Sequence, residues 1–199
     1  MFGYDVTRVT LVKSDARELA RGLRQRDVAV LLALVEQYQY RLVRYLIYLL
    51  GWREGVDDLV QETWLRVLER GSSYDGRSRF EPWLFAIARN LALDQLRKRR
   101  TSSLDSDEYD EDAALPSLVS KDSSPFVLAA RSEDAERLAN SMQMVEPIYR
   151  EALVLRFQEE LSLQEMSTVT GVPVSTVASR VYRGLATLRA QLQGGEHEV

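Results

Sequence analysis

The side chains best suited to chemistry in this sequence are hydrogen-bond donors and cations near its C-terminus. The stretch 174–192 carries three arginines and no acidic residue. Hydroxyl and guanidinium groups gather on one side of the helix expected there, at Ser175, Thr176, Ser179, Arg180, Tyr182 and Arg183. Such groups donate hydrogen bonds to phosphates and to base edges, so the pattern favours nucleic-acid binding.

The composition offers little for catalysis. The sequence has no cysteine, which excludes disulfides, thiolate nucleophiles and cysteine-ligated zinc. Its one histidine, His197, lies in the C-terminal tail, so histidine catalysis and histidine metal sites are not expected. We therefore expect a protein that is not an enzyme and that uses no metal, no cofactor and no small-molecule substrate.

A short helix, a glycine turn and a second helix are predicted to position these donors. Ser162 and Glu165 have the spacing of a capping box, which fixes the start of the first helix. Gly171 can supply the positive φ of a sharp turn, and Pro173 suits the first turn of the next helix. These features predict a helix-turn-helix whose second helix fits the major groove. A helical hairpin with a solvated polar face is the alternative.

Composition and charge pattern limit which folds and functions the molecule can have. The 199 residues, 45% of them hydrophobic, suit one large or two small domains. Glycine and proline are sparse and strand-like alternation is absent, so an all-α fold is expected. No apolar run is long enough to span a membrane and no signal peptide is evident, which favours a cytoplasmic location. The net charge of −4 means that any nucleic-acid binding must come from local basic patches.

The first half of the chain is predicted to be helical, with one unusual surface. A helix is expected over 14–50, ending at Gly51, and another over 57–69. In the second of these, Asp58, Gln61 and Glu62 surround Leu65 on the face opposite the apolar one. A leucine inside an acidic, exposed face hints at a protein-binding surface.

A loop and a basic helix follow. The loop 71–80 holds Tyr74, Arg77 and Phe80, which suit stacking on unpaired bases and holding phosphates, unless its aromatic rings are simply part of the core. The stretch 77–100 has seven basic and two acidic residues, a net charge of +5. Phosphate binding explains four consecutive basic residues better than helix-dipole stabilisation does.

The stretch 101–124 changes character. It has seven acidic residues against one lysine, a net charge of −6, and few large apolar side chains. We expect an irregular acidic linker there. It would join a helical domain over 14–100 to a second over 125–193.

At this point both halves resemble one family. The motifs are DDLVQETWLRV, FEPWLFAIARNLALDQLRKRR and LSLQEMSTVTGVPVSTVASRVYRGLATLR, in that order. Together they resemble the extracytoplasmic-function (ECF) sigma factors of RNA polymerase, group 4 of the sigma-70 family, which keep only the sigma-2 and sigma-4 domains. The resemblance covers roughly residues 18–193.

The resemblance implies a role for each surface. The acidic face would dock on the β′ clamp helices of core RNA polymerase, through Asp57, Asp58, Gln61, Glu62 and Leu65. The loop and basic helix would bind and melt the minus-10 element, through Tyr74, Arg77, Phe80, Arg89, Asn90, Arg97, Lys98, Arg99 and Arg100. The last helix would contact the minus-35 element through the six donors named first.

The resemblance also implies partners and leaves one departure. The expected partners are core RNA polymerase, including its β subunit, promoter DNA and an anti-sigma factor, with a monomer when the protein is free. Ala178 stands where many members have Lys or Arg, which puts the usual minus-35 preference in doubt.

A stand-alone helix-turn-helix regulator and a helical adaptor without a DNA role are the competing functions.

Overall fold

The computed structural model describes residues 16–102 and 133–194, and this part of the chain is helical and contains no strand. Its helices are α1 (Ala16–Gln25), α2 (Val28–Leu50), α3 (Val56–Arg70), the short η2 (Gly71–Ser73), α4 (Phe80–Ser102), α6 (Glu133–Gln143), α7 (Pro147–Leu153), the π-helical η4 (Val154–Gln158), α8 (Leu163–Thr170) and α9 (Val174–Gly194). The expected all-α class is confirmed. The predicted linker and the expected restart of helix at 125 fall almost wholly outside the described residues.

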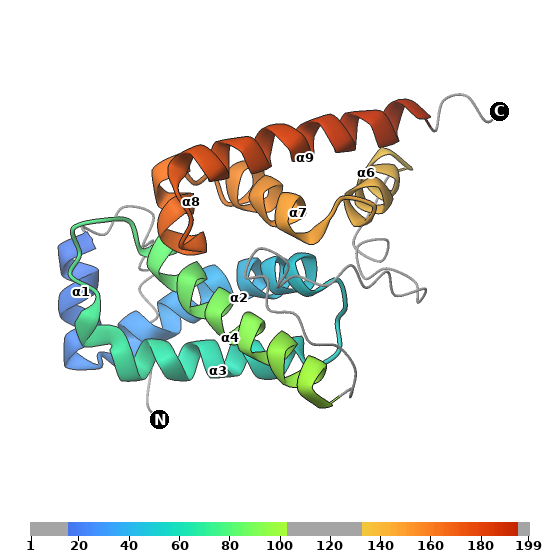
Figure 1. The fold of residues 1–199 in the computed structure, drawn as a ribbon. Coiled ribbons are helices and arrows are strands. Elements are labelled where there is room, and N and C mark those ends of the chain that lie inside the picture. The colour runs from blue at the N-terminus through green and yellow to red at the C-terminus, as the bar shows by residue number, and fades with distance from the viewer. Residues whose placement is uncertain (1–15, 103–132, 195–199) are drawn as a thin grey trace.

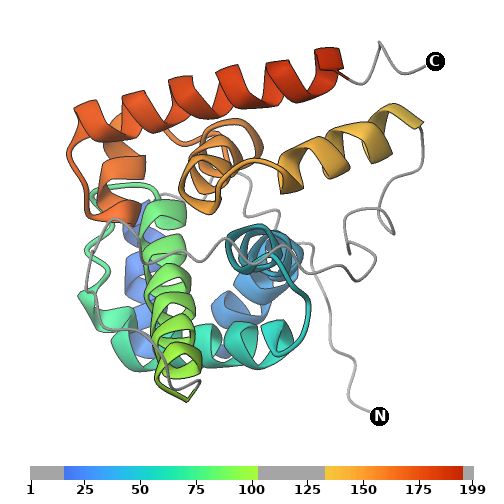
Figure 2. The ribbon, with the colours of Figure 1, turned by 45° about the vertical axis from the view of Figure 1, so that its right-hand side comes forward.

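The helices form two tiers that pack against each other. Helices α1–α4 make the lower tier and α6–α9 the upper one in the view of Figure 1. Helix α4 reaches up to α8, and α2 lies beneath α7, so two pairs of helices join the tiers (Figure 2).

The lower tier is built on α2, most of whose second half is buried. Tyr45 of α2 meets Phe85 of α4 edge to face, with ring centroids 5.0 Å apart. The single helix expected over 14–50 is instead two helices. The break falls at Arg26, whose φ is +53°, and Asp27, whose side chain accepts a hydrogen bond from the Ala29 N–H at 2.9 Å as the N-cap of α2.

In the upper tier α8 and α9 form the predicted helix-turn-helix. Ser162 and Glu165 make the reciprocal capping box at the start of α8, and Gly171 ends it with a φ of +74°. Helix α9 then crosses α7 at Gly184, where a Cβ atom would lie 3.0 Å from the Leu153 side chain and 3.1 Å from the Tyr149 carbonyl oxygen. Because glycine has no Cβ, the two helices can approach this closely.

Candidate nucleic-acid interface

The N-terminal half of α9 presents most of the predicted donors to solvent. Ser175, Ser179, Tyr182 and Arg183 are exposed, Tyr182 at 75% of its full area, and Thr176 is partly exposed. The guanidinium of Arg183 donates a hydrogen bond to the Tyr149 hydroxyl at 3.3 Å, which raises the arginine pKa. The helix-turn-helix therefore has a free face of hydroxyl, phenol and guanidinium groups, all hydrogen-bond donors.

Arg180 does not belong to this exposed face, and its predicted place there was wrong. Only 8% of its area is exposed, because it falls on the same side of α9 as Val177 and Gly184. Spacings of three and four residues put these positions on one helix face. Arg180 thus lies on the side of α9 that packs on the protein.

The basic end of α4 is a second exposed cationic surface. Arg97, Lys98 and Arg99 are exposed there, and Asn90 is exposed earlier in the same helix. Arg97 pairs with Asp94 at 3.2 Å, and the Arg99 guanidinium lies 4.8 Å from the centre of the Trp52 ring. Arg100 continues α4, and its side chain lies outside the description.

The loop 71–80 splits between core and surface. Tyr74 and Phe80 are only 2% and 4% exposed and pack with Trp83, ring centroids 5.4–5.6 Å apart. The Tyr74 hydroxyl donates to the Ser78 carbonyl at 2.6 Å, and burial raises its pKa to about 12. Their assignment to DNA is therefore corrected, and the alternative of core aromatics is confirmed. Arg77 alone of the three is exposed.

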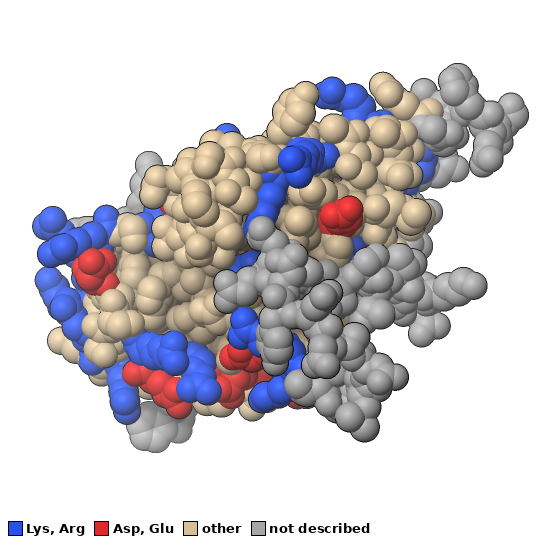
Figure 3. Space-filling view, in the orientation of Figure 1, with Lys and Arg blue, Asp and Glu red and all other residues tan. Residues whose placement is uncertain are grey.

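Helix α3 carries the acidic face. Asp57, Asp58 and Gln61 are exposed, Glu62 is half-buried, and Leu65 among them is 46% exposed. Arg66 pairs with Glu62 at 2.9 Å, so the face is bordered by a cation. Figure 3 shows acidic and basic side chains alternating along the lower edge of the molecule, over α3.

Arg89 lies between the tiers rather than on the surface. Its Nε donates to Glu151 Oε1 of α7 at 2.8 Å, and the Tyr45 hydroxyl donates to the same oxygen at 2.8 Å. The Glu151 side chain is 1% exposed and that of Arg89 12%. Burial and the neighbouring carboxylate hold the pKa of Tyr45 well above its usual value, so the phenol stays a donor.

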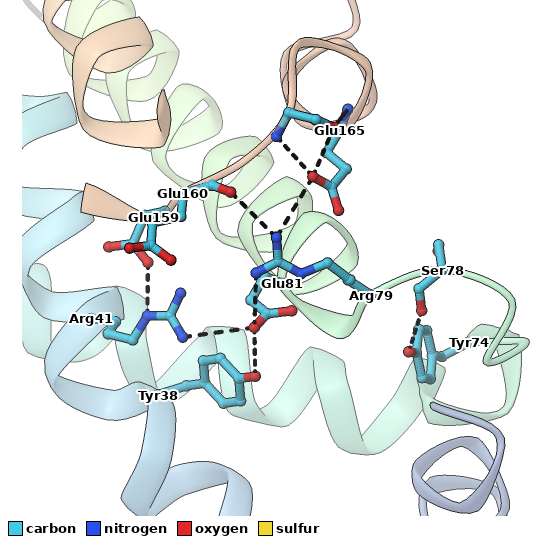
Figure 4. A network of polar contacts seen from close by, with 10 residues as sticks. Tyr38, Arg41, Tyr74, Ser78, Arg79, Glu81, Glu159, Glu160 and Glu165 are labelled. Carbon is cyan, nitrogen blue, oxygen red and sulfur yellow. Dashed lines mark hydrogen bonds and ion pairs between the residues drawn. The ribbon is translucent and has the colours of Figure 1, made fainter. Parts of the chain in front are cut away.

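A second ionic cluster between the tiers was missed by the sequence reasoning. Glu159, which follows η4, accepts from Arg41 Nε at 2.8 Å (Figure 4). It also accepts from Arg44 Nη2 at 3.1 Å. Arg79 adds an ion pair with Glu165 of α8 at 3.7 Å. Arg41 directly precedes the buried Leu42, and Arg44 the buried Tyr45, so the only signal in the sequence was a cation next to a core residue.

Comparisons with known proteins agree with the two tiers. The Sigma-70 region 2 family matches residues 34–102, and the Sigma-70 region 4 family matches residues 135–188. The RNA polymerase sigma factor CarQ of Myxococcus xanthus is 34% identical over 72% of this chain and 78% of its own length. The chain belongs to the ECF sigma factors. The ECF RNA polymerase sigma factor SigW of Bacillus subtilis, 27% identical, spans 92% of this chain and 97% of its own length.

The fold agrees with this family. The sigma factor RpoE of Bartonella quintana, solved in complex with the anti-sigma factor NepR, superposes with a TM-score of 0.63. It is 25% identical and covers 80% of this chain and 94% of that one. The protein is thus a promoter-recognising sigma factor that binds RNA polymerase, a class of regulators rather than of enzymes.

Two negative findings concern the described residues. In neither stretch, 16–102 or 133–194, is any helix both long and apolar enough to cross a membrane. Within those same stretches, histidine, cysteine and carboxylate side chains form no cluster able to hold a metal ion.

Proposed function

We propose that α9 binds the minus-35 element of the promoter and that α4 binds the minus-10 element. The exposed donors of α9 would contact the major groove, and the exposed basic end of α4 would hold duplex phosphates. The observation that carries this proposal is the free face of α9: an acid-free helix, held rigidly by a capped turn, whose polar side is exposed. Ser175, Thr176, Ser179, Tyr182 and Arg183 are the proposed contacts there.

In the lower tier, Asn90 of α4 is the proposed contact to the non-template strand. Its short amide side chain can both donate to and accept from a base edge. Arg77, Arg97, Lys98, Arg99 and Arg100 would bind phosphates, which position a protein on DNA without specifying sequence.

The acidic face of α3 is the proposed docking surface for core RNA polymerase. It combines carboxylates, an amide and the exposed Leu65 within two helical turns, a mixture of charged rim and apolar centre that is typical of protein interfaces. The β′ clamp helices are the proposed partner.

A protein of the anti-sigma class is the proposed inhibitor. Support comes from the structure of the similar sigma factor in complex with its anti-sigma factor NepR. Such a partner would act by covering the polymerase-binding and DNA-binding surfaces.

The function is tested by transcription from genomic promoter fragments. Core RNA polymerase plus this protein should start transcripts at promoters that core polymerase alone ignores. A stand-alone helix-turn-helix regulator would instead bind a duplex by itself and give no new start sites. Mapping the start sites would also identify the minus-10 and minus-35 sequences.

A further inference from the structure

We propose that Arg41, Arg44 and Arg89 form a second phosphate-binding site, which Glu151 and Glu159 occupy in the closed molecule and which nucleic acid takes over when the tiers separate. The inference rests on the proposed function, in that it assumes a DNA-bound open form. The sequence placed only Arg89 near DNA, so Arg41 and Arg44 are new to the site.

The first argument is chemical. The contacts are charge-assisted hydrogen bonds of 2.8–3.1 Å from guanidinium nitrogens to carboxylate oxygens. A phosphate also offers anionic oxygens that accept such bonds from a guanidinium, so it can replace a carboxylate at these arginines. In this sense Glu151 and Glu159 stand where phosphates would bind.

The second argument is the position of the cluster. All three arginines belong to the lower tier, on α2 and α4, and both carboxylates belong to the upper tier. The carboxylates are 0–1% exposed, whereas the arginine side chains keep 12–32% of their area in solvent. Moving the upper tier away would therefore uncover the cations while leaving them fixed on their own helices.

Aromatic rings help to hold the arginines in place without the carboxylates. The Arg41 guanidinium lies 4.9 Å from the centre of the Tyr38 ring, and that of Arg44 lies 5.8 Å from the Tyr40 ring. Cation–π contacts of this kind order a guanidinium while leaving its N–H groups free. Arg41 also keeps its 3.8 Å ion pair with Glu81 of α4, which belongs to the same tier. Arg41 and Arg44 thus stay preorganised for phosphate in an open form.

The third argument is that some polar atoms buried in or near the contact between the tiers lack hydrogen-bond partners. Arg44 Nε, on the guanidinium that pairs with Glu159, is buried with no hydrogen-bond partner in the protein. The same holds for Oε1 of Gln158, which precedes Glu159 in the sequence, and for Nε of Arg150 on α7. Buried groups of this kind and buried ion pairs carry a desolvation penalty that offsets their attraction. An interface rich in both is suited to opening rather than to permanent closure.

Separation of the tiers can be followed with two dyes. The chain has no native cysteine, and Arg70 on α3 and Ala190 on α9 are exposed on opposite tiers. Cysteines at these two positions can carry a donor and an acceptor. Energy transfer between them then reports closure of the full chain.

The test variant is the pair Glu151→Gln and Glu159→Gln. The neutral amides keep the shape but remove the charges that hold the arginines, so energy transfer should fall. If closed molecules outnumber open ones about ten to one, binding of an oligothymidine strand should strengthen about tenfold. The control pair Glu36→Gln and Glu146→Gln, both exposed, changes net charge equally and should alter neither signal.

Removing the arginines separates opening from binding. Adding Arg41→Gln, Arg44→Gln and Arg89→Gln to the open variant should cancel the gain in strand binding. A charge-matched trio on exposed positions, Arg21→Gln, Arg24→Gln and Arg26→Gln, should keep most of it. Unchanged energy transfer in the glutamine pair, opening without a gain in binding, or a gain that survives loss of the three arginines would each overturn the proposal.

If the variant with both glutamines loses helicity, the dye-labelled chain that keeps Glu151 and Glu159 gives a second measurement. Saturating oligothymidine must lower energy transfer in the dye-labelled chain, and a bound complex with unchanged transfer would overturn the proposal. Transcription with core polymerase is measured in parallel. If initiation persists while the proposal is overturned, the proposed function stands; if initiation is absent altogether, it is the proposed function that fails.

Discussion

Arg180 and Arg183 lie less than one turn apart on α9 and meet opposite surroundings. Arg183 is exposed among the donors, whereas Arg180 shares a buried face with Val177 and Gly184. The sequence shows both as cations in a polar run. The spacing of Arg180 from Val177 favours the packed face, but its charge and its polar neighbours favoured the exposed one. Tyr74 and Phe80 present the same difficulty, because a ring can stack on a base or on Trp83 equally well.

Loss of Arg183 should weaken promoter binding of the holoenzyme. Arg183→Ala removes a guanidinium from the exposed face, and we expect roughly tenfold weaker binding if it contacts a base. Arg189→Ala on the same helix, outside that face, is the matched control and should have little effect. Filter binding or gel shift with a cognate promoter measures both. Equal affinities for Arg183→Ala and the original protein would contradict the assigned face.

Leu65→Asp should abolish binding to core polymerase without unfolding α3. Leu65 is half-exposed, so aspartate costs the fold little, but it places a charge at the centre of the proposed docking face. Leu32→Asp on α2, at an even more exposed leucine, is the control. Co-purification with core polymerase and circular dichroism check the two expectations, and normal co-purification of Leu65→Asp would refute the docking face.

Among the elements, the helix-turn-helix was the most predictable. Its capping box and glycine turn are local signals that need no tertiary context, and both are present as predicted. The break between α1 and α2 was not predicted, because Arg26 adopts a positive φ without being glycine. Only Asp27, a good N-cap residue, marks that break in the sequence. The ion pairs between tiers were beyond prediction, because their partners are more than 60 residues apart.

The loop between η2 and α4 is pinned to the first helix at Gly76. Its φ is +70°, and a Cβ there would lie 2.5 Å from the Ala16 carbonyl oxygen. Gly55 has nearly the same φ, +73°, with no atom within 4 Å of a Cβ. We expect Gly55→Ala to cost about 1 kcal/mol of unfolding free energy, and Gly76→Ala clearly more. Urea denaturation of both variants measures this; equal losses would mean that the loop does not pack on α1.

At the scale of the whole molecule, the two tiers are joined by charge as well as by packing. Glu151 is buried and meets Arg89 and Tyr45, so removing the cation alone strands a carboxylate in the interior. Because the cluster mixes residues of three helices, its energy is shared and single substitutions will not add.

A double-mutant cycle measures the link between Arg89 and Glu151. Arg89→Met should lower the free energy of unfolding by about 3 kcal/mol, because it breaks a buried ion pair from one side. Arg89→Met with Glu151→Met should recover part of that loss, since no lone charge remains. Arg77→Met, at an exposed arginine, should cost nothing measurable. Additive losses in the double variant would show that the two side chains do not interact.

Helix α9 crosses α7 at Gly184, so a small tilt of α9 about this point would displace its N-terminal end by a larger distance. Nine residues separate this pivot from Ser175, a length of about 14 Å at the helical rise. A methyl group at the pivot would tilt the rod, and the tilt would be magnified at the tip that carries the hydroxyl donors. The absence of a side chain at Gly184 therefore sets the direction of the end of α9 that we propose to contact DNA, although Gly184 itself lies away from that end.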